Sequence, residues 1–337
     1  MDVDSFPTIY HRLLDATAFG SILTKLLCIY AIVFHTSKNM KYTSYFLLNE
    51  VLWNFSGNLI LTFAHPYPMM PALCFRIDGI VGPILKTDEQ RMLYFCAAVL
   101  TFLNFAVGIV TTFQFRYFTL STFKHRLSQI PKTWAYVYCI VLHALVSTGF
   151  CILVYRWWYP LDGYPKDELP TELENIFCFR PNGTEMIIAC SFVFVVELFA
   201  VFFWILFTVM CFYELRKQEQ HLDKTTLAMQ RVVLRNLLIL TVPPVLQGGI
   251  PLLVAVFFIY NSHLPYARQI VCIAIAIILN LGTTYGIIML TVFRSYREAV
   301  IRMVGVLWNP LKGVVSHSIS HQSSSNVVSV IAAHSKK

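Results

Sequence analysis

Seven long apolar stretches dominate this 337-residue chain and leave few folds open to it. Each has 22 or more residues, whereas a helix needs only about 20 to cross the hydrocarbon core of a bilayer. Strands of a membrane barrel would show alternation over about 10 residues, and these stretches are apolar throughout. The sequence therefore predicts an all-α membrane protein, a bundle of seven transmembrane helices. The expected spans are 14–35, 43–64, 92–115, 134–155, 186–213, 236–260 and 268–293.

The placement of charge orients this bundle. The chain is 57% hydrophobic and 13% charged, against about 25% charged residues in soluble domains. One set of loops (36–42, 116–133, 214–235 and 294–337) holds 17 basic and 4 acidic side chains, and the other (1–13 with Asp15, 65–91, 156–185 and 261–268) holds 8 basic and 12 acidic. Because short cytoplasmic loops are enriched in Lys and Arg, we expect the N-terminus outside and the C-terminus in the cytoplasm. The net charge of +8 then indicates that the basic loops contact anionic lipid of the bilayer or a cytoplasmic partner, and we expect no nucleic acid as a partner.

Three regions follow from this topology. Residues 1–13 are expected to be an extracellular N-terminus, 14–304 the membrane domain and 305–337 a disordered, Ser-rich cytoplasmic tail. Apolar residues recur at helical spacing over 293–304 with arginines between them, which predicts a short amphipathic helix after the last span. No basic segment precedes a short apolar core at the start, so no cleavable signal peptide is expected.

The outer loops carry two candidate modifications. Cys74 and Cys178 lie in the first and second outer loops, where the compartment is oxidising, and a disulfide between them is predicted; two free thiols are the alternative. Asn182 begins a glycosylation sequon that faces outward in this topology, whereas the sequon at Asn54 falls inside a span and should stay unmodified. Three prolines within residues 66–71 forbid continued helix and predict a structured cap over the bundle mouth.

Two ionisable residues in the first two spans suggest a pair. Lys25 and Glu50 fall at similar depths in adjacent antiparallel helices, and a charge in the bilayer needs a partner or water. We predict an intramembrane Lys25–Glu50 pair. The alternative is that each side chain faces water or reaches the interface separately.

Glu197 lies near the middle of the fifth span, with no basic residue expected in the third, sixth or seventh. It is the leading candidate for an acid in a ligand cavity, with Asn104 and Gln247 as further candidates. The alternative for Glu197 is a protonated carboxyl that hydrogen-bonds to a neighbouring helix, and interhelical hydrogen bonds are the usual role of the two amides.

Prolines interrupt the sixth span. Pro243, Pro244 and Pro251 remove backbone hydrogen bonds and predict a kink, and Gly248-Gly249 lies between them. This span is therefore the expected moving part, although a kink is also compatible with static packing.

The sequence offers little for an enzyme, a metal or a cofactor. The ten histidines are scattered without paired boxes beside the spans, and no Gly-rich phosphate loop occurs. A retinal pump would need a lysine in the seventh span, and none lies between Gln269 and Phe293. We expect neither catalysis nor a cofactor.

Six short motifs occur along the chain: FHTSKNM (34–40), YFLLN (45–49), LTF (61–63), PYPMMP (66–71), QFRY (114–117) and SYR (295–297). Together they resemble the nematode serpentine chemoreceptors of the Srh or Sri classes in the Str superfamily, over residues 8–304. Residues 114–117 resemble the close of the third helix in that family, and residues 295–297 resemble the segment after the seventh. The stretch 61–71 favours Sri.

The resemblance implies a G-protein-coupled receptor for a small environmental, odorant-like molecule, in the plasma membrane of sensory-neuron cilia. It implies coupling of a heterotrimeric G protein through Arg116 and Tyr117, exposed by movement of helix six. Gln114 stands where the family usually has an acid, and Ser295 where it has proline. Without a neighbouring carboxylate, Arg116 loses a resting-state partner, so we hypothesise raised basal signalling. As an alternative, Arg116 is only a positive anchor at the inner face.

Two other functions stay open at this point. A small-solute transporter or channel would use Glu197 and Lys25 in a permeation path, with a discontinuous helix at Pro243-Pro244. The lack of a visible repeat and the long Ser-rich tail argue against it. The third possibility is a membrane protein of assembly or trafficking with no ligand.

Overall fold

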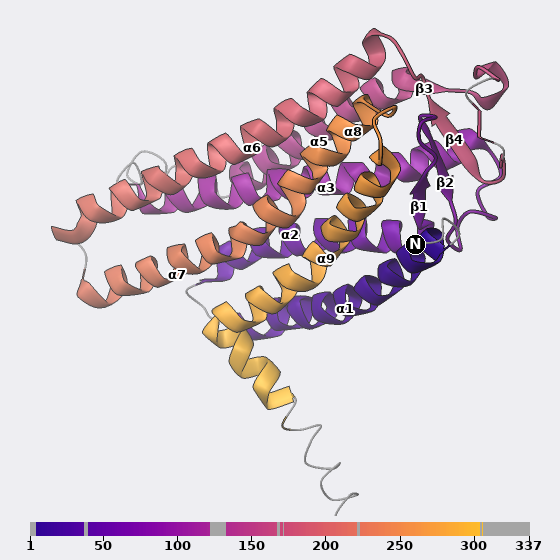
Figure 1. The fold of residues 1–337 in the computed structure, drawn as a ribbon. Helices are drawn as coiled ribbons and strands as arrows, with labels where there is room; N and C mark the ends of the chain where they lie inside the picture. Colours follow the sequence, from indigo (N-terminus) through magenta and orange to yellow (C-terminus); the bar gives the residue numbers. More distant parts are fainter. Residues whose placement is uncertain are drawn as a thin grey trace, which may run out of the picture.

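The computed structural model describes residues 5–36, 40–121, 133–166, 169–170, 172–220, 223–303 and 305. Long helices run roughly along one another, and a small β-sheet lies at one end of them (Figure 1). We call this the sheet end and the other the opposite end. The predicted disordered tail, from residue 306 onward, lies outside the described residues.

Seven helical segments of the described residues form the bundle. Six are long and apolar enough to cross a membrane, and the seventh, α2, carries more polar residues, Glu50 among them. The predicted all-α bundle is thus confirmed. The segments are α1 (Ser5–His35), α2 (Lys41–Ala64), α3 (Asp88–Leu120), α5 (Thr133–Trp157), α6 (Thr184–Lys217), α7 (Lys224–Pro243) continuing through the π-helical η4 (Pro244–Gly249) into α8 (Ile250–Tyr260), and α9 (Ala267–Val292).

The first helix begins earlier than the sequence predicted. Residues 5–13 belong to α1 and are not a separate N-terminal tail. The reason lies in a contact that is invisible in the sequence, because Tyr10 is buried and its hydroxyl donates to the carbonyl of Pro66, 2.9 Å away. The added turns therefore pack against the sheet end.

Local signals fix other helix ends. Thr87 and Gln90 form a capping box at the start of α3, with Asp88 and Glu89 in the first turn, where the helix dipole favours negative charge. At the end of α2, His65 adopts a left-handed conformation with φ +46° and its N–H bonds to the carbonyl of Leu61. This turn directs the chain from the bundle into the sheet.

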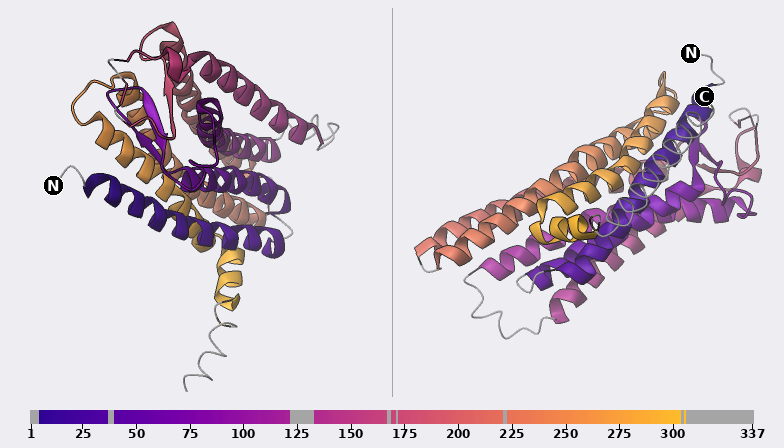
Figure 2. Two further views of the ribbon diagram at one scale, coloured as in Figure 1. Left: turned by 90° about the vertical axis from the view of Figure 1, so that its right-hand side faces the viewer. Right: turned by 90° about the horizontal axis from the view of Figure 1, so that it is seen from below.

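The cap predicted over the bundle mouth contains a four-stranded antiparallel sheet, which sequence analysis missed. The strands lie in front of the helix ends when the molecule is viewed from that side (Figure 2, left). Their order is β1 (Pro66–Pro68), β2 (Cys74–Ile77), β4 (Ile176–Phe179) and β3 (Trp158–Tyr159). Strands of two to four residues are too short to produce a readable alternation.

The core divides along the length of the bundle. One cluster lies under the sheet, where Phe75, Phe177 and Phe179 pack on Trp157 and Met92. A second cluster lies towards the opposite end and joins α1, α2, α3, α7 and α9. Between them the helices leave the space in which the candidate site lies.

A short helix follows α9, as predicted. Residues 294–303 are helical, and Phe293, Tyr296 and Ala299 are buried against the bundle. The Tyr296 hydroxyl lies 3.0 Å from the Thr36 hydroxyl, which ties this helix to the end of α1. Ile301 is 63% exposed, so its apolar side chain is free to meet lipid, as expected for a helix in the interface.

Candidate functional site

A cavity lies between α3, α6, α9 and η4, the irregular part of the sixth span. Its empty volume is about 570 Å³, part of it open to the surroundings. Its walls are mostly apolar, which is typical of a small-molecule site with a few placed polar groups. We call it the Glu197 cavity, and its lining includes Phe105 and Ala106 of α3, Glu197, Ala200 and Trp204 of α6, Gly248 and Gly249 of η4, and Leu281 of α9.

Glu197 is placed in this cavity by α6. It is 8% exposed, and within the described residues it has no hydrogen-bond or ion-pair partner, so the structure does not show the interhelical hydrogen bond that was its alternative role. The carboxylate lies against the backbone of η4, since a Cβ added at Gly249 would lie 2.6 Å from Glu197 Oε1. Only a residue without a side chain allows this approach. Glu197 of α6 therefore contacts η4, the least regular part of the sixth span.

A second, larger cavity adjoins the first on the side of the sheet. Its empty volume is about 1010 Å³. Phe75 and Phe179 from the strands and Trp157 from α5 line it, and no Asp, Glu, Lys, Arg or His does. Phe102, Leu252 and Ile278 line both cavities, so the two are neighbours. We call this the apolar cavity.

The two amide candidates do not line either cavity. Asn104 is fully buried and turns to α5, where Nδ2 donates to Ser147 Oγ at 2.9 Å and Oδ1 lies 2.6 Å from His143 Nδ1. Gln247 lies in η4 outside the lining, and its Oε1 is buried without a hydrogen-bond partner. Depth along a helix, which the sequence gives, does not fix the direction in which a side chain points.

Lys25 and Glu50, which were predicted to pair, are close enough to attract each other electrostatically, but no salt bridge joins them among the described residues. Both are buried, but Lys25 Nζ has no hydrogen-bond partner in the described chain and lies 4.4 Å from the centre of the Tyr285 ring. Glu50 accepts hydrogen bonds from the hydroxyls of Tyr285, at 2.5 Å, and Thr112. Tyr285 of α9 therefore contacts both side chains, and nothing in the sequence marks a tyrosine of the seventh span as their common neighbour.

Arg116 lies near the opposite end of α3 and is 7% exposed. Its guanidinium donates to Gln230 of α7, so a hydrogen bond joins the third helix to the sixth. Tyr117 packs beside Phe207 of α6, with ring centres 6.2 Å apart. Gln230 had no signal in the sequence, because its role depends on how two distant helices pack.

The proline-rich part of the sixth helix departs from α-helical geometry. Pro243 lies inside α7, and residues Pro244–Gly249 form the π-helical η4. Pro251 lacks the N–H that would bond to the carbonyl of residue 247 in a regular helix, which favours a wider turn there. Within the described residues, the irregularity coincides with the wall of the Glu197 cavity.

The sheet end is held by covalent and polar contacts. A disulfide joins Cys74 to Cys178, which face each other in β2 and β4. Asp78 lies 3.1 Å from His11 and 2.5 Å from Arg76. Burial acts to raise the pKa of Asp78, but hydrogen bonds from His11 and Arg76 outweigh it and hold that pKa below its ordinary value.

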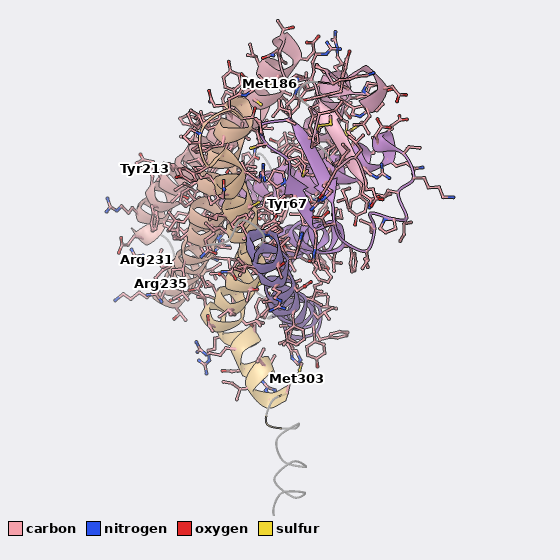
Figure 3. The ribbon with its side chains drawn as sticks, turned by 45° about the vertical axis from the view of Figure 1, so that its right-hand side comes forward. Tyr67, Met186, Tyr213, Arg231, Arg235 and Met303 are labelled. Carbon is pink, nitrogen blue, oxygen red and sulfur yellow. A yellow bond between two sulfur atoms is a disulfide. The ribbon has the colours of Figure 1, made fainter. Side chains whose placement is uncertain are left out.

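His65 extends this polar network to a second carboxylate. Its ring stacks on His11 with centres 5.5 Å apart, and Nε2 lies 3.3 Å from Asp15. Burial lowers the pKa of His65, and the Asp15 carboxylate only partly offsets this. Tyr67 of β1 packs beside the His11 ring of this network and lies at the sheet end (Figure 3). Asn182 is exposed beside the start of α6, where a glycan would have room.

The helices and the cavity together show which class of protein this is. Seven long helices, six of them able to cross a membrane by length and composition, make this a multi-pass membrane protein with an internal cavity. The chain belongs to the Srh family of serpentine type seven-transmembrane GPCR chemoreceptors, whose profile matches residues 5–306. Of the two classes that the motifs resembled, Srh is the one matched, although residues 61–71 favoured Sri. No curated protein matches the chain.

Proposed function

We propose that this receptor detects a small molecule in the Glu197 cavity and activates a heterotrimeric G protein by movement of the sixth span, which consists of α7, η4 and α8. The observation that carries the proposal is that one helix meets both sites. Its η4 segment lies against Glu197, and its α7 part holds Arg116 through Gln230. A ligand that changes the shape of η4 would therefore alter the contact that covers Arg116.

The energetic requirement is a difference between states. A ligand shifts a two-state equilibrium only by its differential affinity for the two states. Glu197 supplies such a difference, because a ligand that contacts its carboxylate acts directly on Gly249 and the bend of the sixth helix. In the resting state the α3–α7 hydrogen bond holds the opposite end closed, and in the active state it is broken.

Orientation completes the proposal. We place the sheet end outside the plasma membrane and the opposite end in the cytoplasm, as the loop charges predict. Arg231 and Arg235 project from α7 on the surface (Figure 3). Arg231 pairs with Glu219 at 3.1 Å, and Arg235 would offer positive charge to anionic lipid or a G protein. The family resemblance favours sensory-neuron cilia as the location.

The test is ligand-dependent signalling in cells. Cells that display the full chain on their surface would be exposed to an odorant panel while G-protein activation is recorded. The proposal predicts that at least one compound activates, and that Ala200→Leu, which fills the Glu197 cavity, abolishes the response with surface display unchanged.

Solute flux separates the receptor from a transporter. Proteoliposomes that contain the purified chain should show no flux of the activating compound above protein-free vesicles. Saturable flux without G-protein activation would reject the proposal.

A further inference from the structure

Glu197 is the one acid or base that lines either cavity, apart from weakly acidic thiols, in the described part of the chain. It is more than nine-tenths buried, and no cation of the described residues pairs with it. An unpaired carboxylate inside a membrane is costly, which is why such groups normally have a partner or serve function. The partner is thus missing from the protein itself.

The cavity selects what that partner can be. The carboxylate is the strongest hydrogen-bond acceptor there, and the hydroxyl of Thr241 already donates to the carbonyl of Leu237 at 2.6 Å. Trp204, two turns from Glu197 on the same face of α6, also lines the cavity, together with Phe102 and Phe105. Aromatic faces and a carboxylate both attract a cation, and a desolvated site strengthens that attraction.

The neighbouring apolar cavity determines the chemical character of the rest of the ligand. The apolar cavity shares Phe102, Leu252 and Ile278 with the Glu197 cavity and is lined by aromatic and aliphatic side chains. Each CH₂ group buried in such a space contributes about 0.8 kcal/mol in transfer free energy. A molecule that lies at Glu197 and reaches the neighbouring cavity therefore meets one acidic group, the hydroxyl of Thr241 and the indole N–H of Trp204, and otherwise apolar surface.

From this placement we infer that Glu197 binds the ammonium group of an amphiphilic amine whose hydrocarbon part extends into the apolar cavity. The inference rests on the proposed function, since it assigns a ligand class to the same site. A neutral molecule of the same length also fills the apolar cavity, and an alcohol hydroxyl can donate a hydrogen bond to Glu197, but it brings no positive charge to the carboxylate. The receptor thus discriminates an amine from the matching alcohol.

The test compares two probes of equal length on the purified full chain in lipid nanodiscs. Binding of 1-octylamine and 1-octanol is followed by the shift in Tm over a concentration series. The amine should bind about thirtyfold more tightly or better, as expected when one partner of a desolvated charge pair is absent. Glu197→Gln should reduce this preference to within a few fold, and Glu197→Asp should retain most of it.

Two control variants distinguish binding in the cavities from partition of the probes into the lipid. Glu214→Gln makes the same change on the same helix outside both cavities, and it should keep the preference of the wild type. Ala200→Leu keeps the carboxylate but fills the space beside it, and it should weaken binding of both probes. If Glu197→Gln does not fold, the comparison of amine and alcohol on the wild type still decides the result, and Ala200→Leu shows whether both probes bind in this cavity.

Equal binding of amine and alcohol by the wild type, or an amine preference that survives Glu197→Gln, would overturn the inference. Because the readout is binding alone, its outcome is independent of coupling. Amine-selective binding without G-protein activation would leave the inference intact and remove the proposed function. Activation by neutral compounds alone, unaffected by Glu197→Gln, would do the reverse.

Discussion

At the scale of single residues, contacts between helices decide what each polar side chain does. Lys25 and Glu50 were predicted to pair because their depths agree, yet the Tyr285 hydroxyl donates to Glu50 and the Tyr285 ring contacts Lys25. Asn104 was predicted in a cavity and instead bonds to α5. The sequence gives the depth of a residue in the membrane but not its rotation about the helix axis, so the partners could not be predicted.

Gly249 allows the close approach of Glu197 to η4. Gly249→Ala would place a Cβ 2.6 Å from Glu197 Oε1, so the carboxylate or the helix must shift. We expect a loss of about 1–3 kcal/mol from overpacking and a weaker ligand response. Thermal unfolding and a dose–response curve measure the two effects. Gly305→Ala is the matched control because a Cβ there has no neighbour within 4 Å, and an equal loss in both variants would contradict the account.

Gln230 holds Arg116 in the structure, so its removal should raise basal signalling. A hydrogen bond to a charged group contributes roughly 1.5–3 kcal/mol, and Gln230→Leu should therefore raise ligand-free G-protein activation about tenfold or more. Gln230→Glu should lower it, because a carboxylate binds Arg116 more strongly. Basal activity at matched surface expression is the measurement, and a change in the same direction in both variants would refute this role.

This contact also revises the hypothesis about Gln114. That hypothesis assumed that Arg116 has no resting-state partner without an acid at position 114. The structure gives Arg116 a partner from α7 instead. Gln114→Glu remains an informative variant, since unchanged basal output would reject a resting-state role for position 114.

At the scale of elements, long apolar helices were predictable and short or irregular segments were not. Six of the seven spans follow from length and hydropathy in the described residues, and α2 is more polar. The ends are shifted where helices such as α1 and α6 extend past the apolar stretch. The sheet depends on pairing between residues about 100 positions apart, which no local pattern encodes. Prolines predicted a kink at Pro243–Pro251, and the missing N–H of Pro251 favours a wider turn, but the extent of the π-helical η4 over Pro244–Gly249 had no signal in the sequence.

The disulfide joins strands β2 and β4 of the cap and closes a stretch of chain that includes α3 and α5. Cys74 and Cys178 are 104 residues apart, and a crosslink over so long a loop limits the unfolded chain strongly. The double variant Cys74→Ser with Cys178→Ser should lose about 2–5 kcal/mol of stability. Thermal unfolding of the purified receptor measures it. Cys151→Ser, at an exposed free cysteine, is the control, and a double variant as stable as this control would show that the bond contributes nothing.

The polar network of the cap predicts a dependence on pH. Since the pKa of His65 is lowered in the folded protein, the unfolded chain takes up a proton more readily, and stability must fall as pH drops through the ordinary value of 6.5. We expect the Tm to decrease between about pH 7.5 and 5.5. His65→Asn keeps a residue that tolerates the left-handed backbone and should flatten this dependence. The same slope in both proteins would exclude His65 as its source.

At the scale of the whole molecule, the account depends on which end faces the cytoplasm. The prediction is that an epitope tag after Lys337 stains only permeabilised cells, whereas a tag before Met1 stains intact cells. The reason is the excess of Lys and Arg in the loops of the opposite end. Surface staining of the carboxyl-terminal tag would reverse the topology and remove both the glycosylation at Asn182 and the proposed G-protein face.

The most direct test of the central claim is nucleotide exchange on a purified G protein. The full chain in nanodiscs would be mixed with a heterotrimeric G protein and a compound that activates it in cells. We predict that the compound accelerates exchange severalfold, that Ala200→Leu removes the acceleration and that Gln230→Leu raises the rate without ligand. Binding of the compound with no change in exchange, for every G protein that responds to other receptors in the same assay, would contradict the account.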